Sequence, residues 1–323
     1  MPASPSTLAA LPFPLHPETP ADSGGLAGQE RHGRTRRAGQ PSRQTGPPSS
    51  TSSTATAATA ATAAASTSQL RAAMALSVNI GDRRVCVTAQ ALAPGPFAPF
   101  GAVIANPRPD VHPSAFAAAA ASLPADAVSA NQGSAIQYRA ASRARSLYAQ
   151  APSGRADPVT SVFVCAARAL RPAAAASAAD APHRRFTVRV VERHPFTTQT
   201  FAPLASSASA YLVVVAPSLA PAAADAHLPV PRGPGLPGSG LPDLRGLRAF
   251  VASGAQAVTY GAGTWHAPMV VPGEPGATLD FVVSQWMSGV RDEDCQLVEF
   301  ESQGAAEPRV EVRIPQPPRL EKL

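Results

Sequence analysis

The chain of 323 residues is poor in cysteine, in long apolar runs and in lysine. Its three cysteines, Cys86, Cys165 and Cys295, are far apart and form no CxxC pair, which argues against a disulfide framework and against a structural zinc site. No run approaches the roughly 18 apolar residues that span a bilayer, and no charged segment followed by an apolar one opens the chain. We therefore expect reduced thiols, no membrane contact and a cytoplasmic location.

The basic residues give a net charge of +6 but no nucleic-acid signature. A nucleic-acid surface groups basic residues on one element with aromatic side chains between them. The densest basic group has no aromatic residue beside it and consists of Arg31, Arg34, Arg36 and Arg37. Because Lys322 is the only lysine, the excess of arginine can reflect codon usage. We expect no nucleic-acid partner.

Residues 1–73 consist mainly of Ser, Thr, Pro, Ala, Gly and Arg. Such a segment cannot bury enough apolar surface to offset the entropy of ordering it, so we predict a disordered tail. Its many arginines and serines, with Glu18, Asp22 and Glu30 as its acidic residues, are also typical of a mitochondrial transit peptide. An organellar location and a true start at Met74 therefore stay open as alternatives.

The sequence pattern of residues 74–323 predicts one mostly-β domain, because short β-branched and aromatic runs are separated by Pro and Gly. The predicted strands are Val159–Cys165, Arg185–His194, Tyr211–Ala216, Ala257–Tyr260, Met269–Val271, Leu279–Gln285 and Leu297–Glu301. Two Ala/Pro/Gly-rich stretches, 171–182 and 217–242, contain few large apolar residues, so we interpret them as surface insertions. Short helices are expected at Ala115–Ser122 and Ala140–Tyr148.

The clearest strand, Arg185–His194, ends in polar residues that could carry chemistry. Period-two alternation places Glu192 and His194 on one face and Arg193 on the other. The face assigned to Glu192 and His194 also carries Phe186, Val188 and Val190. After a turn, Gln199 brings an amide to the same barrel mouth. The alternative is that Glu192 pairs with a surface arginine and His194 only caps a turn.

A second candidate cluster surrounds His266, which follows Tyr260 and a glycine-bounded turn. In small barrels of the cupin kind, two such strands bring their histidines together, so we expect His266 to face His194. The alternative is a core histidine beside Trp265. His194, Gln199 and His266 look like a degraded cupin metal set, which would hold a divalent ion weakly unless Glu192 joins it. The set is compatible with a metal and does not demand one.

Several separated segments together resemble one known family. They are PFAPFGAVI (96–104), NQG (131–133), YR (138–139), ERHPFTTQTFAPL (192–204), LRAFVASGAQAVTY (247–260), WHAP (265–268) and DC (294–295). In this order they resemble the ureidoglycolate lyase family of allantoin and purine catabolism, over residues 90–301. Segments matching in order are far more specific than one motif alone.

The resemblance implies a cupin-like β-barrel of the jelly-roll type, a homodimer, and cleavage of ureidoglycolate to glyoxylate and urea. The resemblance implies no required cofactor, and a divalent metal remains a candidate. Bacterial members often carry a second histidine after the Trp-His pair, where this chain has Ala267, so that position is not expected to be essential. The tail and both insertions lie outside the family pattern.

The expected chemistry is an elimination that needs a base and an acid. His194 or His266 can take the hydroxyl proton, because an imidazole titrates near neutral pH. Glu192 either orients an imidazole or acts as the acid, while Tyr260 can protonate the leaving nitrogen. The substrate-binding candidates are Gln199 for the ureido carbonyl, and Arg139 with Asn131 for the carboxylate.

Three other functions remain as alternatives at this stage. A cupin-like module that binds a small carboxylate without turnover would make His194 and His266 dispensable. A hydrolase acting on ureidoglycolate would release ammonia instead of urea. A metal-dependent oxygenase would need iron, and the set of metal ligands in this sequence is too incomplete to favour it.

Overall fold

The computed structural model describes residues 75–172, 183–223, 225–303 and 307–315, all within the compact unit Ala57–Leu323. The predicted tail, 1–73, lies outside the described residues, as does most of the first insertion. The predictions of disorder and of targeting in the tail therefore stay predictions. In the described part of the chain, no helix is long and apolar enough to cross a membrane.

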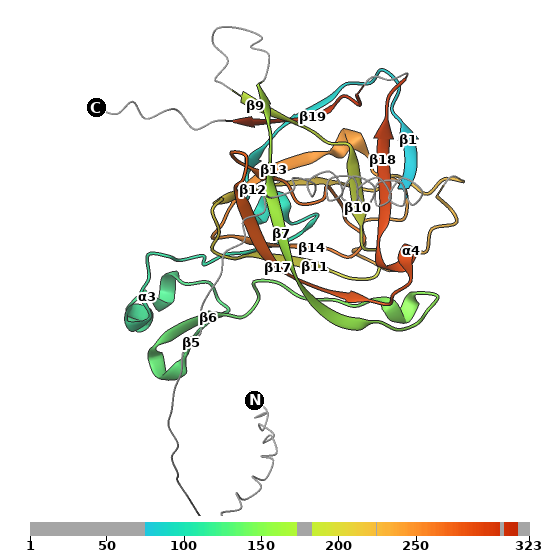
Figure 1. The fold of residues 1–323 in the computed structure, drawn as a ribbon. Coiled ribbons are helices and arrows are strands. Elements are labelled where there is room, and N and C mark those ends of the chain that lie inside the picture. The colour runs from blue at the N-terminus through green and yellow to red at the C-terminus, as the bar shows by residue number, and fades with distance from the viewer. Residues whose placement is uncertain (1–74, 173–182, 224, 304–306, 316–323) are drawn as a thin grey trace, which may run out of the picture. The chain divides into compact units, whose positions relative to one another are not determined.

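Strands dominate the described chain and form three large sheets and one hairpin (Figure 1). The first sheet has the order β1 (Ala75–Asn79), β18 (Gln296–Glu301), β10 (Val190–Arg193), β15 (Trp265–His266), β12 (Ala210–Ala216), β13 (Arg248–Ser253) and β3 (Gln90–Ala91). The second has the order β16 (Val271–Pro272), β7 (Asp157–Arg168), β17 (Thr278–Met287), β11 (Gln199–Pro203), β14 (Ala257–Tyr260) and β4 (Gly101–Ile104). The third has the order β2 (Val85–Thr88), β19 (Val310–Pro315), β9 (His183–Thr187) and β8 (Arg171–Pro172), and the hairpin pairs β5 (Ala127–Ala130) with β6 (Ala135–Tyr138).

Helices in the described residues are single turns. The α-helical turns are α2 (Pro94–Phe97), α3 (Phe116–Ala119) and α4 (Arg291–Asp294). The 3₁₀ turns are η1 (Pro113–Ala115), η2 (Ala120–Ser122), η3 (Asn131–Gly133), η4 (Tyr148–Gln150) and η5 (Leu244–Gly246). The predicted mostly-β, barrel-like fold with a few short helices is confirmed.

The seven-stranded sheet is buried on both faces, which makes it the middle layer. Along β12, Leu212 and Val214 face one apolar cluster, shared with the four-stranded sheet through Phe186 and Val312. The alternate residues of β12 face a second cluster, shared with the six-stranded sheet, and include Tyr211, Val213 and Val215. A strand covered on both sides reads as a continuous apolar run, which explains the sequence of β12.

Most of the predicted strands are confirmed, but the strand expected at Arg185–His194 is two strands. β9 belongs to the four-stranded sheet and β10 to the seven-stranded sheet, with a break at Val188 and Arg189. The break changes the alternation, so that Val191 joins Val188 in the same cluster. Glu192 therefore does not share a face with Phe186 and Val188, as predicted, and Val190 is only partly buried. The prediction of one uninterrupted alternation was wrong.

Two further local predictions have different outcomes. The helical stretch at Ala115–Ser122 is present as η1, α3 and η2 in succession. The helix expected at Ala140–Tyr148 is absent, because this segment runs beside residues 196–198 instead. Leu147 N donates to Phe196 O, and Thr198 N donates to Arg145 O. Pairing with a distant segment thus overrides the local helical propensity.

Candidate active site

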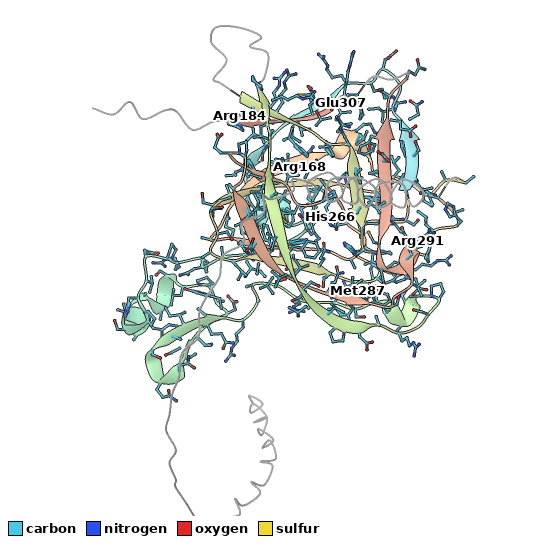
Figure 2. The ribbon with its side chains drawn as sticks, in the orientation of Figure 1. Arg168, Arg184, His266, Met287, Arg291 and Glu307 are labelled. Carbon is cyan, nitrogen blue, oxygen red and sulfur yellow. The ribbon has the colours of Figure 1, made fainter. Side chains whose placement is uncertain are left out.

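The candidate site lies between the seven-stranded and six-stranded sheets, on β10, β15, β11 and β14. Glu192 of β10 is the cross-strand partner of His266 of β15, and His266 is in turn opposite Val215. Because opposed residues point to the same face, Glu192 and His266 face the cluster that contains Val215. Figure 2 shows His266 among the interior side chains.

His266 is 2% exposed and is held in one orientation from two sides. Its Nδ1 donates to Thr264 O at 2.9 Å, and its ring stacks on Tyr260 with centroids 4.0 Å apart and an interplanar angle of 11°. This assignment leaves Nε2 as the acceptor. Nε2 lies 3.7 Å from Glu192 Oε1 and forms no hydrogen bond with any described residue. The free nitrogen thus faces the carboxylate.

His194 follows β10 and faces His266, with the ring centroids 5.5 Å apart. Its Nδ1 donates to Asp294 O at 2.6 Å, while Nε2 is buried without a hydrogen-bond partner among the described residues. The peptide N–H of Gly263 donates to His194 O at 2.8 Å, which ties the strand end to the turn before β15. The sequence-based expectation that the two rings share one chamber agrees with this geometry.

Burial sets the protonation states of two groups in this chamber. Desolvation, together with a smaller effect of the neighbouring His194, lowers the pKa of His266 to about 3. His266 is therefore uncharged at neutral pH. Burial raises the pKa of Tyr260 well above 10, with smaller contributions from Tyr211 and Glu192, so Tyr260 keeps its proton and can donate it.

Gln199 of β11 adds an amide beside this group. It is 3% exposed and pairs across the sheet with Tyr260. Its Nε2 donates to Gln285 Oε1 at 2.7 Å, whereas its Oε1 finds no partner in the described chain. Buried polar atoms are rarely left unsatisfied, so this oxygen and the two imidazole Nε2 atoms indicate a position for a ligand.

The donor set also fits a divalent metal ion. One ligand atom each from Glu192, His194 and His266 lie within 4.8 Å of one another. Two imidazoles and one carboxylate form a ligand set that zinc enzymes use, with a further position left for water or substrate. This group contains His194 and His266 of the set predicted from the sequence, together with Glu192, and the metal itself stays a prediction.

The predicted carboxylate clamp lies elsewhere in the chain. Asn131 is at the tip of the β5–β6 hairpin, with a φ of 49°, and Arg139 directly follows β6. Figure 1 shows this hairpin apart from β10 and β18. No hydrogen bond or ion pair among the described residues joins either side chain to the two histidines. The structure therefore does not bring them to the site of their own chain.

Two features near the histidines were missed by the sequence analysis. The carbonyl of Asp294 positions His194, and the Asp294 carboxylate accepts hydrogen bonds from Tyr148 OH and Ser288 N. Cys295 Sγ lies 4.0 Å from Glu192 Oε2. The only available signal was that Asp294 and Cys295 belong to the family-like segments.

Two imidazoles, a carboxylate and a protonated phenol, enclosed between the sheets of a mostly-β fold, define an enzyme with a buried site for acid–base or metal-assisted chemistry. The family model that matches residues 84–307 is described as ureidoglycolate lyase. The chain belongs to the ureidoglycolate lyase family.

Relatives from fungi and bacteria agree with this membership. A protein named ureidoglycolate lyase in Schizosaccharomyces pombe is 36% identical over 218 residues, which cover 67% of this chain and 92% of that protein. The Saccharomyces cerevisiae protein of the same name is 43% identical over 99 residues, 30% of this chain and 40% of the relative. One from Burkholderia mallei is 37% identical over 98 residues, 30% of this chain and 42% of the relative.

Proposed function

We propose that this chain cleaves ureidoglycolate into glyoxylate and urea, and so serves allantoin degradation in purine catabolism. The family and the names of the relatives supply the substrate. The observation that carries the chemistry is the pair of buried histidines, whose Nε2 atoms have no described partner and lie next to Glu192. A cytoplasmic location is part of the same proposal.

The reaction needs one proton removed and one added. The central carbon of ureidoglycolate bears a hydroxyl, a carboxylate and the ureido nitrogen. A base removes the hydroxyl proton, the C–O bond becomes the carbonyl of glyoxylate, and the C–N bond breaks with its electron pair going to nitrogen. An acid then protonates that nitrogen to give urea. Each assisted proton transfer contributes roughly 10²–10⁴-fold.

The geometry divides these roles among the buried groups. We assign the base to His194, because the strongly lowered pKa makes His266 a poor proton acceptor at neutral pH. His266 instead accepts a hydrogen bond in its neutral form. Tyr260, protonated and stacked on His266, supplies the proton for the leaving nitrogen. The free Oε1 of Gln199 accepts from the ureido N–H groups, rather than holding the carbonyl as the sequence suggested.

A bound divalent ion would be held by Glu192, His194 and His266. Such an ion acts as a Lewis acid, which polarises the substrate oxygen and favours loss of its proton. In either case Tyr260 remains the proton donor, and the enclosing sheets exclude water from the reacting carbon.

We further propose a homodimer in which the hairpin of one copy completes the site of the other. Val162 and Val164 of β7 are 64% and 66% exposed, and such apolar strand surface marks an interaction site. In the proposed dimer, Asn131 and Arg139 of the second copy bind the substrate carboxylate, for which a guanidinium is a fitting partner. Sedimentation analysis of the full chain tests the dimer, and a monomer with full activity contradicts it.

The direct test incubates the purified full chain with ureidoglycolate and measures glyoxylate, urea and ammonia. The proposal expects glyoxylate and urea in equal amounts. Ammonia in place of urea would move the chain to the hydrolase reaction. Binding of the substrate without turnover, unchanged in His194→Ala, would identify a non-catalytic binding module.

A further inference from the structure

Directly before each site histidine is a residue that points to the opposite face of the sheet. Arg193 precedes His194, and Trp265 precedes His266. Strand alternation places these two residues on the side of the four-stranded sheet, where Trp265 belongs to the apolar cluster. Anything that moves Arg193 or Trp265 therefore moves the adjoining histidine.

Arg193 is a fully buried arginine, 0% exposed, with several well-formed contacts. Its guanidinium lies 4.4 Å from the centre of the Trp265 ring, which is a cation–π contact. Its Nε donates to Gln296 Oε1 at 2.8 Å, as neighbouring strands bring the two side chains together. Arg193 thus links β10, β15 and β18 behind the site.

The other donors of Arg193 are used by the Pro-rich stretch 217–242. Nη1 donates to Gly240 O at 3.0 Å and Nη2 donates to Ser239 O at 2.9 Å. Trp265 Nε1 donates to the same carbonyl of Gly240 at 3.0 Å. The stretch is therefore anchored to the two residues that precede the site histidines, which the interpretation as a surface insertion did not anticipate.

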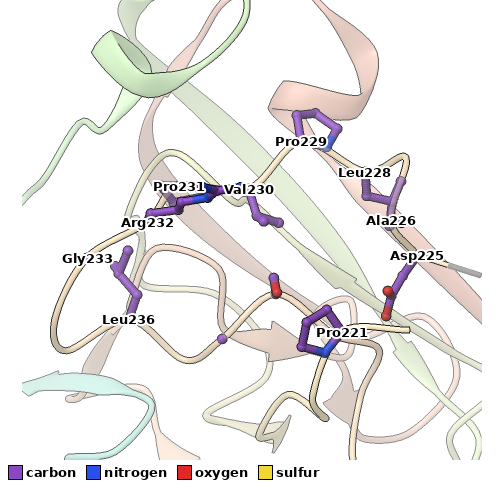
Figure 3. Close-up of a pocket in the computed structure, with 12 residues that line it drawn as sticks. Pro221, Asp225, Ala226, Leu228, Pro229, Val230, Pro231, Arg232, Gly233 and Leu236 are labelled. Atoms are coloured by element: carbon purple, nitrogen blue, oxygen red, sulfur yellow. The ribbon is translucent and has the colours of Figure 1, made fainter. Parts of the chain in front are cut away.

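The stretch 217–242 has internal order although it contains no helix or strand among its described residues. The buried carboxylate of Asp225 accepts from Ala222 N and Leu241 N, and Gln296 Nε2 donates to Pro229 O. The stretch lines a partly open pocket of about 580 Å³, whose walls include Asp225 and Arg232 (Figure 3). The stretch is therefore an ordered segment, which Arg193 holds at Ser239 and Gly240.

The same stretch also reaches the turn that connects the two histidine segments. A Cβ placed on Gly263 would meet Pro237 Cγ at 3.4 Å and Pro195 O at 3.9 Å, so this turn, Pro195 and the stretch are closely packed. Gly263, with a φ of +79°, donates its N–H to His194 O. The stretch therefore contacts the histidine segments at two places.

We propose that Arg193 and Trp265 are positioning residues, which use the stretch 217–242 to fix His194 and His266 at their reacting separation. The inference rests on the proposed lyase function and names the residues that organise its site. Misplacement of a reacting group by about 1 Å can cost roughly 10²-fold in rate, so loosening this connection lowers kcat more than it raises KM.

The test compares Arg193→Lys and Trp265→Phe with the wild type in the full chain, using Arg313→Lys, at an exposed position of β19, as the matched control. Lysine keeps the charge but cannot bond both carbonyls while stacking on the ring. We expect kcat to fall by about 10–100-fold in Arg193→Lys and by less in Trp265→Phe, with KM within about twofold. The control should match the wild type.

Two readouts are independent of turnover. Trypsin should cleave after the exposed Arg232 faster in Arg193→Lys than in the wild type, and the imidazole NMR signals of His194 and His266 should shift or broaden. If the wild type lacks lyase activity but both readouts appear, the positioning stands and the proposed function fails. Unchanged kcat, or lower kcat with unchanged trypsin cleavage and histidine signals, would overturn the positioning role. Should Arg193→Lys not fold, Trp265→Phe decides by the same criteria.

Discussion

The two faces of strands β10 and β15 differ in whether their buried polar atoms have hydrogen-bond partners. On the face of Glu192 and His266, the Nε2 atoms of both histidines lack hydrogen-bond partners in the described part of the chain. On the face of Arg193 and Trp265, the guanidinium and the indole N–H each bond to a carbonyl of the adjoining stretch. Unsatisfied acceptors mark the chemical side, and satisfied donors mark the supporting side.

Removing His194 should give the largest effect, because it abolishes the proposed base. We expect His194→Ala to lower kcat by about 10³-fold, within the range for a general base. Steady-state kinetics on ureidoglycolate measure the loss. The matched control is His112→Ala, an exposed histidine whose Nδ1 contacts Ser114. An equal loss in both variants would contradict the comparison.

Changing the supporting side should also lower stability, in addition to its effect on kcat. Arg193→Met leaves the carbonyl of Ser239 without its donor and that of Gly240 with only the indole N–H of Trp265. It also removes a buried charge that burial already disfavours, as the lowering of the Arg193 pKa to about 10 shows. We expect a net loss of about 1–3 kcal/mol in the free energy of unfolding, read from urea denaturation. A variant as stable as the wild type would show that these bonds add nothing to the fold.

The pH dependence of stability separates the two faces further. The pKa of His266 falls from 6.5 in the unfolded chain to about 3 in the fold. The unfolded chain therefore binds more protons between these values, so stability is present above pH 6.5 and is lost as pH falls toward 3. Between pH 6.5 and 5 we expect a loss of about 1–2 kcal/mol from this group.

His266→Gln isolates that contribution, because glutamine does not titrate. Urea denaturation at several pH values should show a flatter acid limb for this variant than for the wild type. Parallel curves would mean that His266 is not buried in its neutral form.

The smallest effect expected is that of Tyr260→Phe, which keeps the ring that stacks on His266 and removes only the hydroxyl. We expect kcat to fall by roughly tenfold, since water or another group can still protonate the leaving nitrogen, albeit less well. KM should change little. Kinetics on the same substrate give the answer, and unchanged kcat would remove Tyr260 from the reaction.

The residues of the chemical side could be predicted from the sequence, whereas those of the supporting side could not. Two-residue spacing and a glycine turn are local signals, so they were sufficient to suggest that Glu192, His194 and His266 meet. The break between β9 and β10 depends on which sheet receives each half, and Arg193 is buried only because distant carbonyls and Trp265 receive its donors. Partners far apart in the chain leave no periodic pattern.

The positions of Asn131 and Arg139 were equally beyond local reasoning. Their motif suggested a binding role, but a motif does not say which copy of the chain it serves. The structure places the β5–β6 hairpin apart from the site of its own chain (Figure 1). A role for Asn131 and Arg139 in binding the substrate carboxylate therefore requires the proposed homodimer.

The most direct test of the central claim is a crystal structure of the full chain with glyoxylate bound. The account predicts the glyoxylate carbonyl between the Nε2 atoms of His194 and His266, with Tyr260 on the same side. Glyoxylate held elsewhere, with both Nε2 atoms farther from it than the length of the substrate, would contradict the account.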